Sequence, residues 1–156
     1  MTTLHTVERI DPGDDLLACS TLSRIDHVDV HSLTSGDGPR DPLGWAREIL
    51  EGPGATVRLR LRAGWTMLGI RLHRGARDAI AGWPITHHDR EYVRVQSNSP
   101  IGLSGELITR MAGDRVEFAT LVRLDNPAAR LVWARVLPTH LGVVRSLMDS
   151  AASRVG

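Results

Sequence analysis

The longest regular hydrophobic pattern in the chain lies near its C-terminal end, between Asn126 and Arg154. At about 100° per residue, apolar side chains and one histidine fall on one face, whereas Arg135, Thr139 and Asp149 fall on the other. The apolar face consists of Trp133, Val136, Leu137, His140, Val144, Leu147, Met148 and Ala151. This spacing predicts one long amphipathic helix, which has to pack against a sheet or another helix.

The segment before this helix has the alternation of an antiparallel meander. Strands are predicted at residues 91–96, 101–111 and 115–124, because apolar and β-branched residues recur there between turn signals. Residues 97–100 (Ser-Asn-Ser-Pro) and residues 113–114 (Gly-Asp) are the predicted turns. The sheet is expected to place its apolar face against the terminal helix.

Two helix starts can be read directly from the residue types. Asp41 and Asn126 each have a side chain that can accept a hydrogen bond from a free backbone N–H, and Pro42 and Pro127 suit the first helical turn. The Gly-Pro-Gly run at residues 52–54 is expected to end the first of these helices.

The N-terminal half of the chain is less regular. Residues 1–14 are polar and predict a loose arm, and β-branched residues predict a strand near residues 25–33. Residues 57–72 fit both strand alternation and helical spacing, and a helix is favoured, whereas residues 75–84 predict a connector. The order strand, helix, helix, meander, long helix indicates an α+β fold, and the length of 156 residues indicates one domain.

Composition narrows the class of protein. The net charge is +1, and the nineteen basic residues, all arginine, are interleaved with eighteen acidic ones, which argues against a nucleic-acid-binding face. The single Cys19 cannot form an internal disulfide and fits a cytoplasmic location. The first residues do not resemble a signal peptide, and no apolar stretch is long enough to span a membrane.

Three C-terminal segments resemble a known group of sequences. Residues 120–126 (Thr-Leu-Val-Arg-Leu-Asp-Asn), 129–133 (Ala-Arg-Leu-Val-Trp) and 137–140 (Leu-Pro-Thr-His) are similar to an uncharacterised bacterial group, domain-of-unknown-function family 2867. Residues 26–30 and 41–45 are weaker matches at the expected places. The element order resembles the helix-grip fold of the START-like (SRPBCC) superfamily, in which a curved antiparallel sheet packs on a long C-terminal helix.

The resemblance implies a ligand class but no catalytic residues. It implies binding of apolar or amphipathic small molecules, in some members with cyclase or dehydratase activity. A curved sheet around a helix commonly leaves a pocket between them. The side chains expected to reach such a pocket, each of which could equally be ordinary core packing, are Trp65, Tyr92, Phe118, Trp133 and His140.

His140 is the main candidate for acid–base chemistry. It lies near the middle of the apolar helix face, beside Pro138, which removes the N–H that would bond to the Ala134 carbonyl. Its ring can shuttle a proton or orient a polar ligand atom, or it can be a buried ring that bonds to the backbone. In an enzyme its partner would be a carboxylate such as Asp29 or Glu106.

The strand containing Asp29 offers two further histidines. His27, Asp29 and His31 share one face, because alternate side chains of a strand point the same way. If this face lines the pocket, the three can join His140. If Val28 and Val30 face the core instead, all three are solvated, and the two β-branched residues favour this second arrangement.

Other short motifs do not support a metal or a cofactor. Residues 87–89 (His-His-Asp) lack zinc spacing and are expected to form a polar turn. Residues 102–105 (Gly-Leu-Ser-Gly) lie in the meander and lack the spacing of a nucleophile elbow, and residues 52–54 lack the glycines of a dinucleotide site. The sequence therefore predicts no metal and no cofactor.

Three functions remain open from the sequence. The first is binding of a hydrophobic or amphipathic small molecule between the sheet and the C-terminal helix. The second is a cyclase- or dehydratase-type enzyme that uses His140 with a carboxylate. The third is an interaction module without a ligand, such as a homodimer.

Overall fold

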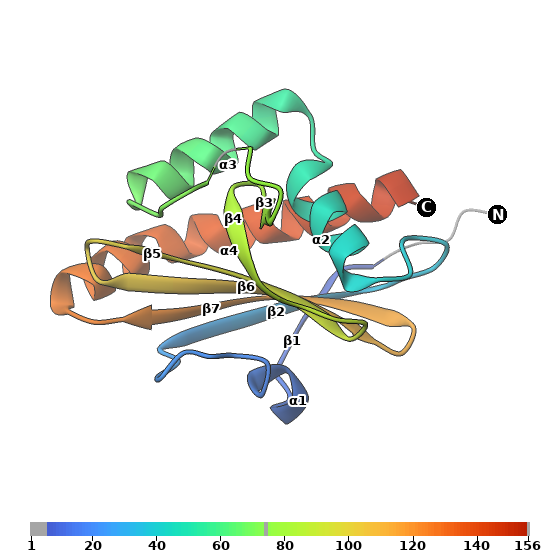
Figure 1. Ribbon diagram of the computed structural model, residues 1–156, viewed down its shortest axis with the longest axis horizontal. Coiled ribbons are helices and arrows are strands. Elements are labelled where there is room, and N and C mark those ends of the chain that lie inside the picture. Colours follow the sequence, from blue (N-terminus) through green and yellow to red (C-terminus); the bar gives the residue numbers. More distant parts are fainter. Residues whose placement is uncertain (1–5, 74, 156) are drawn as a thin grey trace.

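The computed structural model describes residues 6–73 and 75–155 and has an α+β architecture (Figure 1). Its elements, in chain order, are β1 Glu8–Ile10, α1 Asp14–Leu17, β2 His27–Thr34, α2 Pro42–Glu51, α3 Ala55–Met67, β3 Ala79–Ile80, β4 Trp83–His88, β5 Tyr92–Ser99, β6 Leu103–Ala112, β7 Arg115–Leu124 and α4 Pro127–Val155. The predicted order of strand, two helices, meander and long terminal helix is confirmed from β2 onward.

The strands form one antiparallel sheet in the order β1-β2-β7-β6-β5-β4-β3. Strands β3 to β7 pair in sequence order, each with the next. β2 joins the sheet by pairing with β7, which lies far along the chain. α4 and α2 cover one face of the sheet, and the short α1 lies on the other (Figure 1). The strand β2 therefore lies inside the sheet with both of its faces covered.

Two apolar clusters follow from the period-two alternation of the strands. On the α4 side, Val116, Phe118 and Val122 of β7 join the main core with residues of α2 and α4. On the α1 side, Ala119 and Leu121 of the same strand join a smaller cluster. A strand buried on both faces has apolar residues at successive positions, as Phe118-Ala119 and Leu121-Val122 do.

The terminal helix begins where the sequence predicts. The Asn126 side chain accepts a hydrogen bond of 2.8 Å from the Ala129 backbone N–H, and Pro127 occupies the first turn. Trp133, Leu147 and Met148 are buried on the predicted apolar face. The helix continues through Pro138 to Val155, so proline does not end it.

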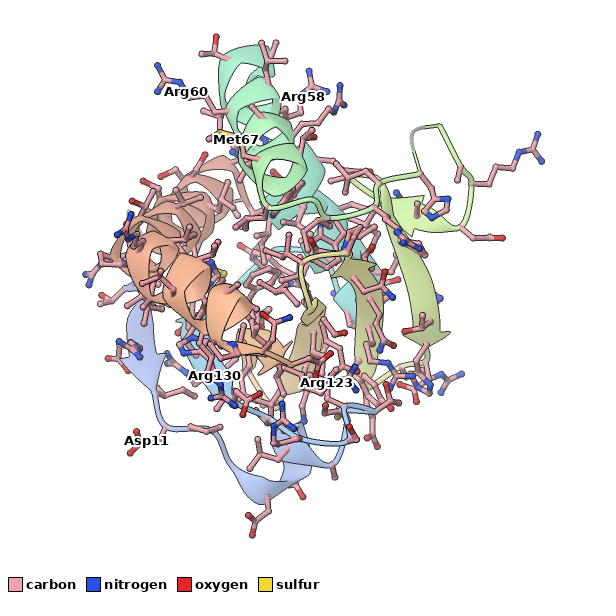
Figure 2. All side chains as sticks on the ribbon, turned by 90° about the vertical axis from the view of Figure 1, so that its left-hand side faces the viewer. Asp11, Arg58, Arg60, Met67, Arg123 and Arg130 are labelled. Carbon is pink, nitrogen blue, oxygen red and sulfur yellow. The ribbon has the colours of Figure 1, made fainter. Side chains whose placement is uncertain are left out.

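The two helices between β2 and β3 differ in how much they bury. Asp41 accepts a hydrogen bond of 2.9 Å from the Gly44 N–H and caps α2, whose Trp45 is fully buried. The helix favoured for residues 57–72 is confirmed as α3, but no residue of α3 is buried, and Leu59 and Met67 are exposed. Met67 and Arg60 point away from the body of the molecule (Figure 2).

Several predicted boundaries are wrong in the parts of the chain that form the edges of the sheet. Residues 8–10 pair with β2 as an edge strand instead of belonging to a loose arm, and Asp14–Leu17 is helical; residues 1–5 of that arm lie outside the described residues. Residues 75–84 contain β3 and the start of β4 instead of a plain connector. Elements of two to four residues are too short to show a period, so only their tertiary partners identify them.

The turns around β4 and β5 also lie elsewhere than predicted. His87 and His88 end strand β4 instead of forming a turn. β5 continues to Ser99, so that most of the predicted turn at residues 97–100 belongs to the strand. The hairpin turn at residues 113–114 is confirmed, because Ala112 pairs with Arg115. Polar residues in a strand look like a turn when the strand's partner is unknown.

The one cysteine is enclosed between α1 and the sheet. Cys19 is 7% exposed, and burial raises the pKa of its thiol, against a smaller lowering effect from Arg110. Because the thiolate is the reactive form, we expect a thiol reagent at pH 8 to modify Cys19 at least about tenfold more slowly in the native protein than in denaturant. Following the absorbance of released thiolate under both conditions tests this, and equal rates would contradict the enclosure.

Among the described residues, no helix is both long and apolar enough to cross a membrane.

Candidate functional site

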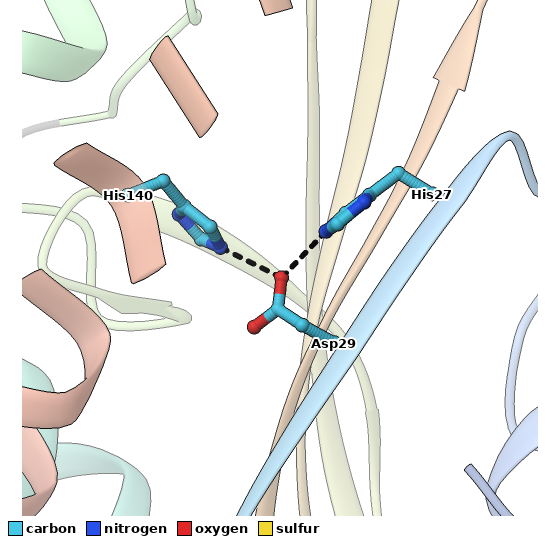
Figure 3. Close-up of side chains that lie close together, drawn as sticks. All are labelled: His27, Asp29 and His140. Atoms are coloured by element: carbon cyan, nitrogen blue, oxygen red, sulfur yellow. Dashed lines mark hydrogen bonds and ion pairs between the residues drawn. The ribbon is translucent and has the colours of Figure 1, made fainter. Parts of the chain in front are cut away.

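Three titratable side chains from two elements meet at one carboxylate oxygen. Asp29 of β2 lies with its Oδ2 atom 2.7 Å from His27 Nε2 and 2.9 Å from His140 Nε2 (Figure 3). The two imidazole rings approach this oxygen from different sides, His27 from the same strand and His140 from α4. The pairing of His140 with Asp29, one of the two carboxylates proposed from the sequence, is thus present.

Local structure explains why these residues meet. His27, Asp29 and His31 are two residues apart, so β2 turns all three side chains to one face of the sheet. That face is the one covered by α4, which packs along β2 and β7. His140 lies on the same apolar helix face as Trp133 and Val144, and this face is turned toward the sheet.

The expectation that this strand face is solvated is wrong. Asp29 is 2% exposed and His31 is 3% exposed. The argument for solvation assumed that only one side of β2 is buried, with Val28 and Val30 facing the core. Those two valines do pack in the smaller apolar cluster, but α4 covers the other face as well.

The charges of the cluster are set by its hydrogen bonds. Burial alone would raise the pKa of Asp29, but the hydrogen bonds from His140 and His27 outweigh burial and hold this pKa well below its usual range. Burial lowers the pKa of His31, and the nearby Asp29 charge only partly opposes this. The centre of the site is therefore an ionised carboxylate surrounded by imidazole rings.

Several buried polar atoms around Asp29 have no hydrogen-bond partner among the described residues. The other carboxylate oxygen, Asp29 Oδ1, is one of them. His31 Nδ1, which lies 3.6 Å from that oxygen, is a second. Thr120 Oγ1 is a third, on the residue that pairs with Asp29 across β2 and β7. These atoms belong to side chains that are at least nine-tenths buried.

Trp133 forms an apolar wall beside the cluster. Its ring centroid lies 5.1 Å from that of His27 and 5.1 Å from that of His140. The indole Nε1 is buried and also has no partner among the described residues. Of the rings proposed from the sequence as ligand contacts, Trp133 is the one that adjoins the cluster.

The other three proposed rings do not converge on this point. Phe118 is a buried core residue opposite His31 in the β2–β7 register. Trp65 packs edge-on against Trp83, with ring centroids 5.6 Å apart. Tyr92 stacks on His87 and packs against the smaller cluster on the α1 side of the sheet.

Glu106, the alternative carboxylate partner for His140, lies on the opposite face of the sheet. It is fully buried, and its two carboxylate oxygens accept hydrogen bonds from the Ser20 hydroxyl and from the Thr21 N–H and hydroxyl. The Arg94 guanidinium lies 3.8 Å away and donates to the Cys19 carbonyl. Glu106 and Arg94 thus hold the segment after α1 onto the sheet, away from His140.

The His-His-Asp run at residues 87–89 forms a separate, exposed pair. His87 Nε2 lies 2.8 Å from Asp89 Oδ2, and the two side chains are 34% and 46% exposed. Hydrogen bonds from His87 and from the Tyr92 and Glu91 backbone lower the pKa of Asp89 to about 2, with the Tyr92 N–H contributing most. His140 does not join this run and contacts Asp29 instead.

Two surface recesses of the described chain lie away from the cluster. One is beside α1 and includes Asp15, Arg110 and Glu117 in its lining. The other lies between α2 and α3 and includes Leu61 and Trp65. Neither lies between the sheet and α4, where the sequence predicts a ligand pocket.

Three members of the site were missed or undervalued from the sequence. His27 and His31 were grouped with Asp29 by their period of two, but nothing local shows that α4 covers them. Thr120 carries no signal of its own, because its role depends on the β2–β7 register. The pairing of residues about ninety positions apart cannot be read from one strand.

Comparison of the chain with protein-family models, with curated proteins and with solved structures finds no match in any of the three. The resemblance to the START-like superfamily stays a prediction.

Proposed function

We propose that the chain is a helix-grip domain that binds a small molecule with a polar end, and that this end lies against Asp29 between β2 and α4. The architecture supports the proposal, since an antiparallel sheet packs one face on a long C-terminal helix after a strand and two helices. The ligand class follows from the START-like resemblance and from the apolar Trp133 wall beside the polar cluster.

The unpartnered buried polar atoms around Asp29 carry this proposal. Each buried donor or acceptor without a partner costs about 1–3 kcal/mol, so native proteins rarely keep several in one place without a purpose. Asp29 Oδ1 can only accept, the Trp133 indole can only donate, and the Thr120 hydroxyl can do both. A ligand hydroxyl or amide, which both donates and accepts, matches this set.

Acid–base catalysis at the same place is the second candidate function. His140 Nε2 is within hydrogen-bond distance of the carboxylate, as a histidine–carboxylate pair requires. Because its pKa is well below the usual range, Asp29 is ionised near neutral pH. The carboxylate would orient the ring, and the imidazole would transfer the proton.

A homodimer through α3 is a third candidate. It rests on a different observation, the exposed apolar side chains of Val57, Leu59 and Met67. Arg58 and Arg60 lie among them on the same helix (Figure 2). Sedimentation of the wild type and of Leu59→Ser at equal concentrations decides whether this surface joins two chains.

The ligand proposal predicts a specific loss on changing His140. Tag-free protein is incubated with a small-molecule extract of bacterial cells and analysed by native mass spectrometry. We expect a retained adduct in the wild type that is lost in His140→Gln and in Thr120→Val, because both changes alter the polar surface around Asp29.

His87→Gln is the matched control, since it changes the exposed His87–Asp89 pair, which has nearly the same distance. This variant should keep the adduct. An adduct kept equally by all variants, or no adduct in the wild type, would contradict binding at Asp29. A thermal unfolding curve of each variant separates loss of the ligand from loss of the fold.

A further inference from the structure

The residues around Asp29 Oδ2 present an unusual combination of ligand atoms. His27, Asp29 and His140 each offer one atom, and these atoms all lie within 4.8 Å of one another. Two imidazole nitrogens and one carboxylate oxygen suit zinc and other first-row divalent transition metals. Calcium and magnesium prefer sites built from oxygen alone.

The distances are close to those of a bound ion. Two ligands that each lie about 2.0–2.1 Å from an ion, at angles between octahedral and tetrahedral values, are about 2.9–3.4 Å apart. The observed separations from Asp29 Oδ2 are 2.7 Å to His27 Nε2 and 2.9 Å to His140 Nε2. Opening these contacts by a few tenths of an ångström would bring both into that range, and the two Nε2 atoms lie within 4.8 Å of each other.

The surroundings hold the three groups in a converging arrangement. The imidazole rings are nearly perpendicular, at 85°, and both direct Nε2 at the same oxygen (Figure 3). Trp133 contacts both rings and limits their rotation. Asp29 is fixed within β2, so the ligands come from a rigid strand and a rigid helix.

The site is neither closed nor freely exposed. The Asp29 side chain is fully buried, whereas the side chains of His27 and His140 are 14% and 15% exposed. Three protein ligands leave at least one coordination position for water or another molecule, which is the arrangement of catalytic zinc sites. The buried carboxylate would also be neutralised by the ion, which lowers the cost of its burial.

We propose that His27, Asp29 and His140 bind one divalent transition-metal ion, with zinc chemistry the best match, through the two Nε2 atoms and a carboxylate oxygen. The inference deepens the proposed function at the same site and rests on it for the small molecule, whose polar end would take the open coordination position. Binding of the ion itself does not require the small molecule. It excludes acid–base use of the same two nitrogen atoms, because a coordinated Nε2 cannot also carry a proton.

The chain contains a control for metal binding by any neighbouring histidine and carboxylate. His87 and Asp89 are as close as the buried pair, but no third ligand completes a cluster there among the described residues. This pair should bind a metal ion weakly. A substitution at His87 therefore removes the same chemical group without touching the proposed site.

The test is metal titration of the full, tag-free chain after removal of bound ions with a chelator. Zn²⁺ binding is measured by isothermal titration calorimetry, and Co²⁺ is used as an absorbing substitute whose visible spectrum reports coordination. We expect one ion per chain for the wild type and for His87→Gln. His140→Gln, His27→Gln and Asp29→Asn should each weaken binding at least about 100-fold, since loss of an outer-shell partner alone costs 10–100-fold.

Binding of one ion that depends on these three residues supports the proposal. No stoichiometric binding, or binding that His140→Gln and His27→Gln leave unchanged, overturns it. These two side chains are partly exposed, so their variants keep the test decisive if Asp29→Asn does not fold, as circular dichroism would show.

Metal binding and small-molecule binding can be contradicted separately. An ion bound without any retained small molecule would support the metal site and contradict the ligand proposal. A small molecule retained equally by chelator-treated and untreated protein, with no ion bound, would support the ligand proposal and contradict the metal site.

Discussion

Replacing Glu106 with glutamine should lower the free energy of unfolding by about 3 kcal/mol, because it removes the charge from a buried ionic pair. Arg94 is 8% exposed and would keep its charge with no carboxylate beside it. The glutamine amide would also have to replace an acceptor that now receives hydrogen bonds from Ser20 and Thr21. Urea unfolding followed by circular dichroism measures the loss.

Glu91→Gln is the matched control for this substitution. Glu91 is exposed at the turn before β5, so the same chemical change there should shift the free energy of unfolding by less than about 0.5 kcal/mol. Zn²⁺ affinity of Glu106→Gln should match the wild type, since Glu106 and Asp29 lie on opposite faces of the sheet. A stable Glu106→Gln protein that has lost metal or small-molecule binding would instead show that Glu106 is part of the functional site.

The two buried carboxylates among the described residues therefore have different roles. Glu106 has partners for both of its oxygens, all from the segment after α1 and from β5. Asp29 has two histidine partners on one oxygen, whereas the other oxygen has no hydrogen-bond partner among the described residues and lies 3.6 Å from His31 Nδ1. A carboxylate with a complete set of partners stabilises structure, whereas one with an incomplete set is available to bind.

Much of the fold could be predicted from local signals. The caps at Asp41 and Asn126, the hairpin turn at residues 113–114 and the strand at residues 115–124 are all present as expected. Each depends on residues that are close in sequence, such as a side chain that bonds a backbone N–H three residues later. The long amphipathic helix is of the same kind, because its stripe repeats over many turns.

The site could be predicted only in part, because its contacts are not local. Period-two spacing grouped His27 with Asp29, and helical spacing placed His140 on the apolar face. Whether the two sets meet depends on β2 pairing with β7, which brings the strand under α4. Both faces of β2 are buried, because α4 covers one face and the short α1, whose four residues carry no pattern, lies on the other. The strand alone shows neither cover, so its sequence favours the solvated arrangement for Asp29.

Replacing Pro138 with alanine should raise the free energy of unfolding by about 2 kcal/mol, and at the same time weaken binding at Asp29. An alanine at this position provides an N–H for the Ala134 carbonyl and removes the ring that crowds that carbonyl, and proline costs up to about 3 kcal/mol relative to alanine inside a helix. Pro138 is exposed, so the change leaves no cavity. His140 follows two residues later, and a straighter helix would move its ring relative to Asp29.

Pro127→Ala is the control, because proline in the first helical turn lacks no intrahelical hydrogen bond and the change should be nearly neutral. Thermal unfolding of the two variants measures the change in stability, and Zn²⁺ titration measures the change in binding at Asp29. Higher stability of Pro138→Ala with unchanged binding would show that the proline does not position His140. Lower stability would show that the surrounding core requires the helix as proline shapes it. The expected combination, a firmer helix with a weaker site, would mean that the chain keeps a helix-disfavouring residue because His140 must reach the carboxylate on β2.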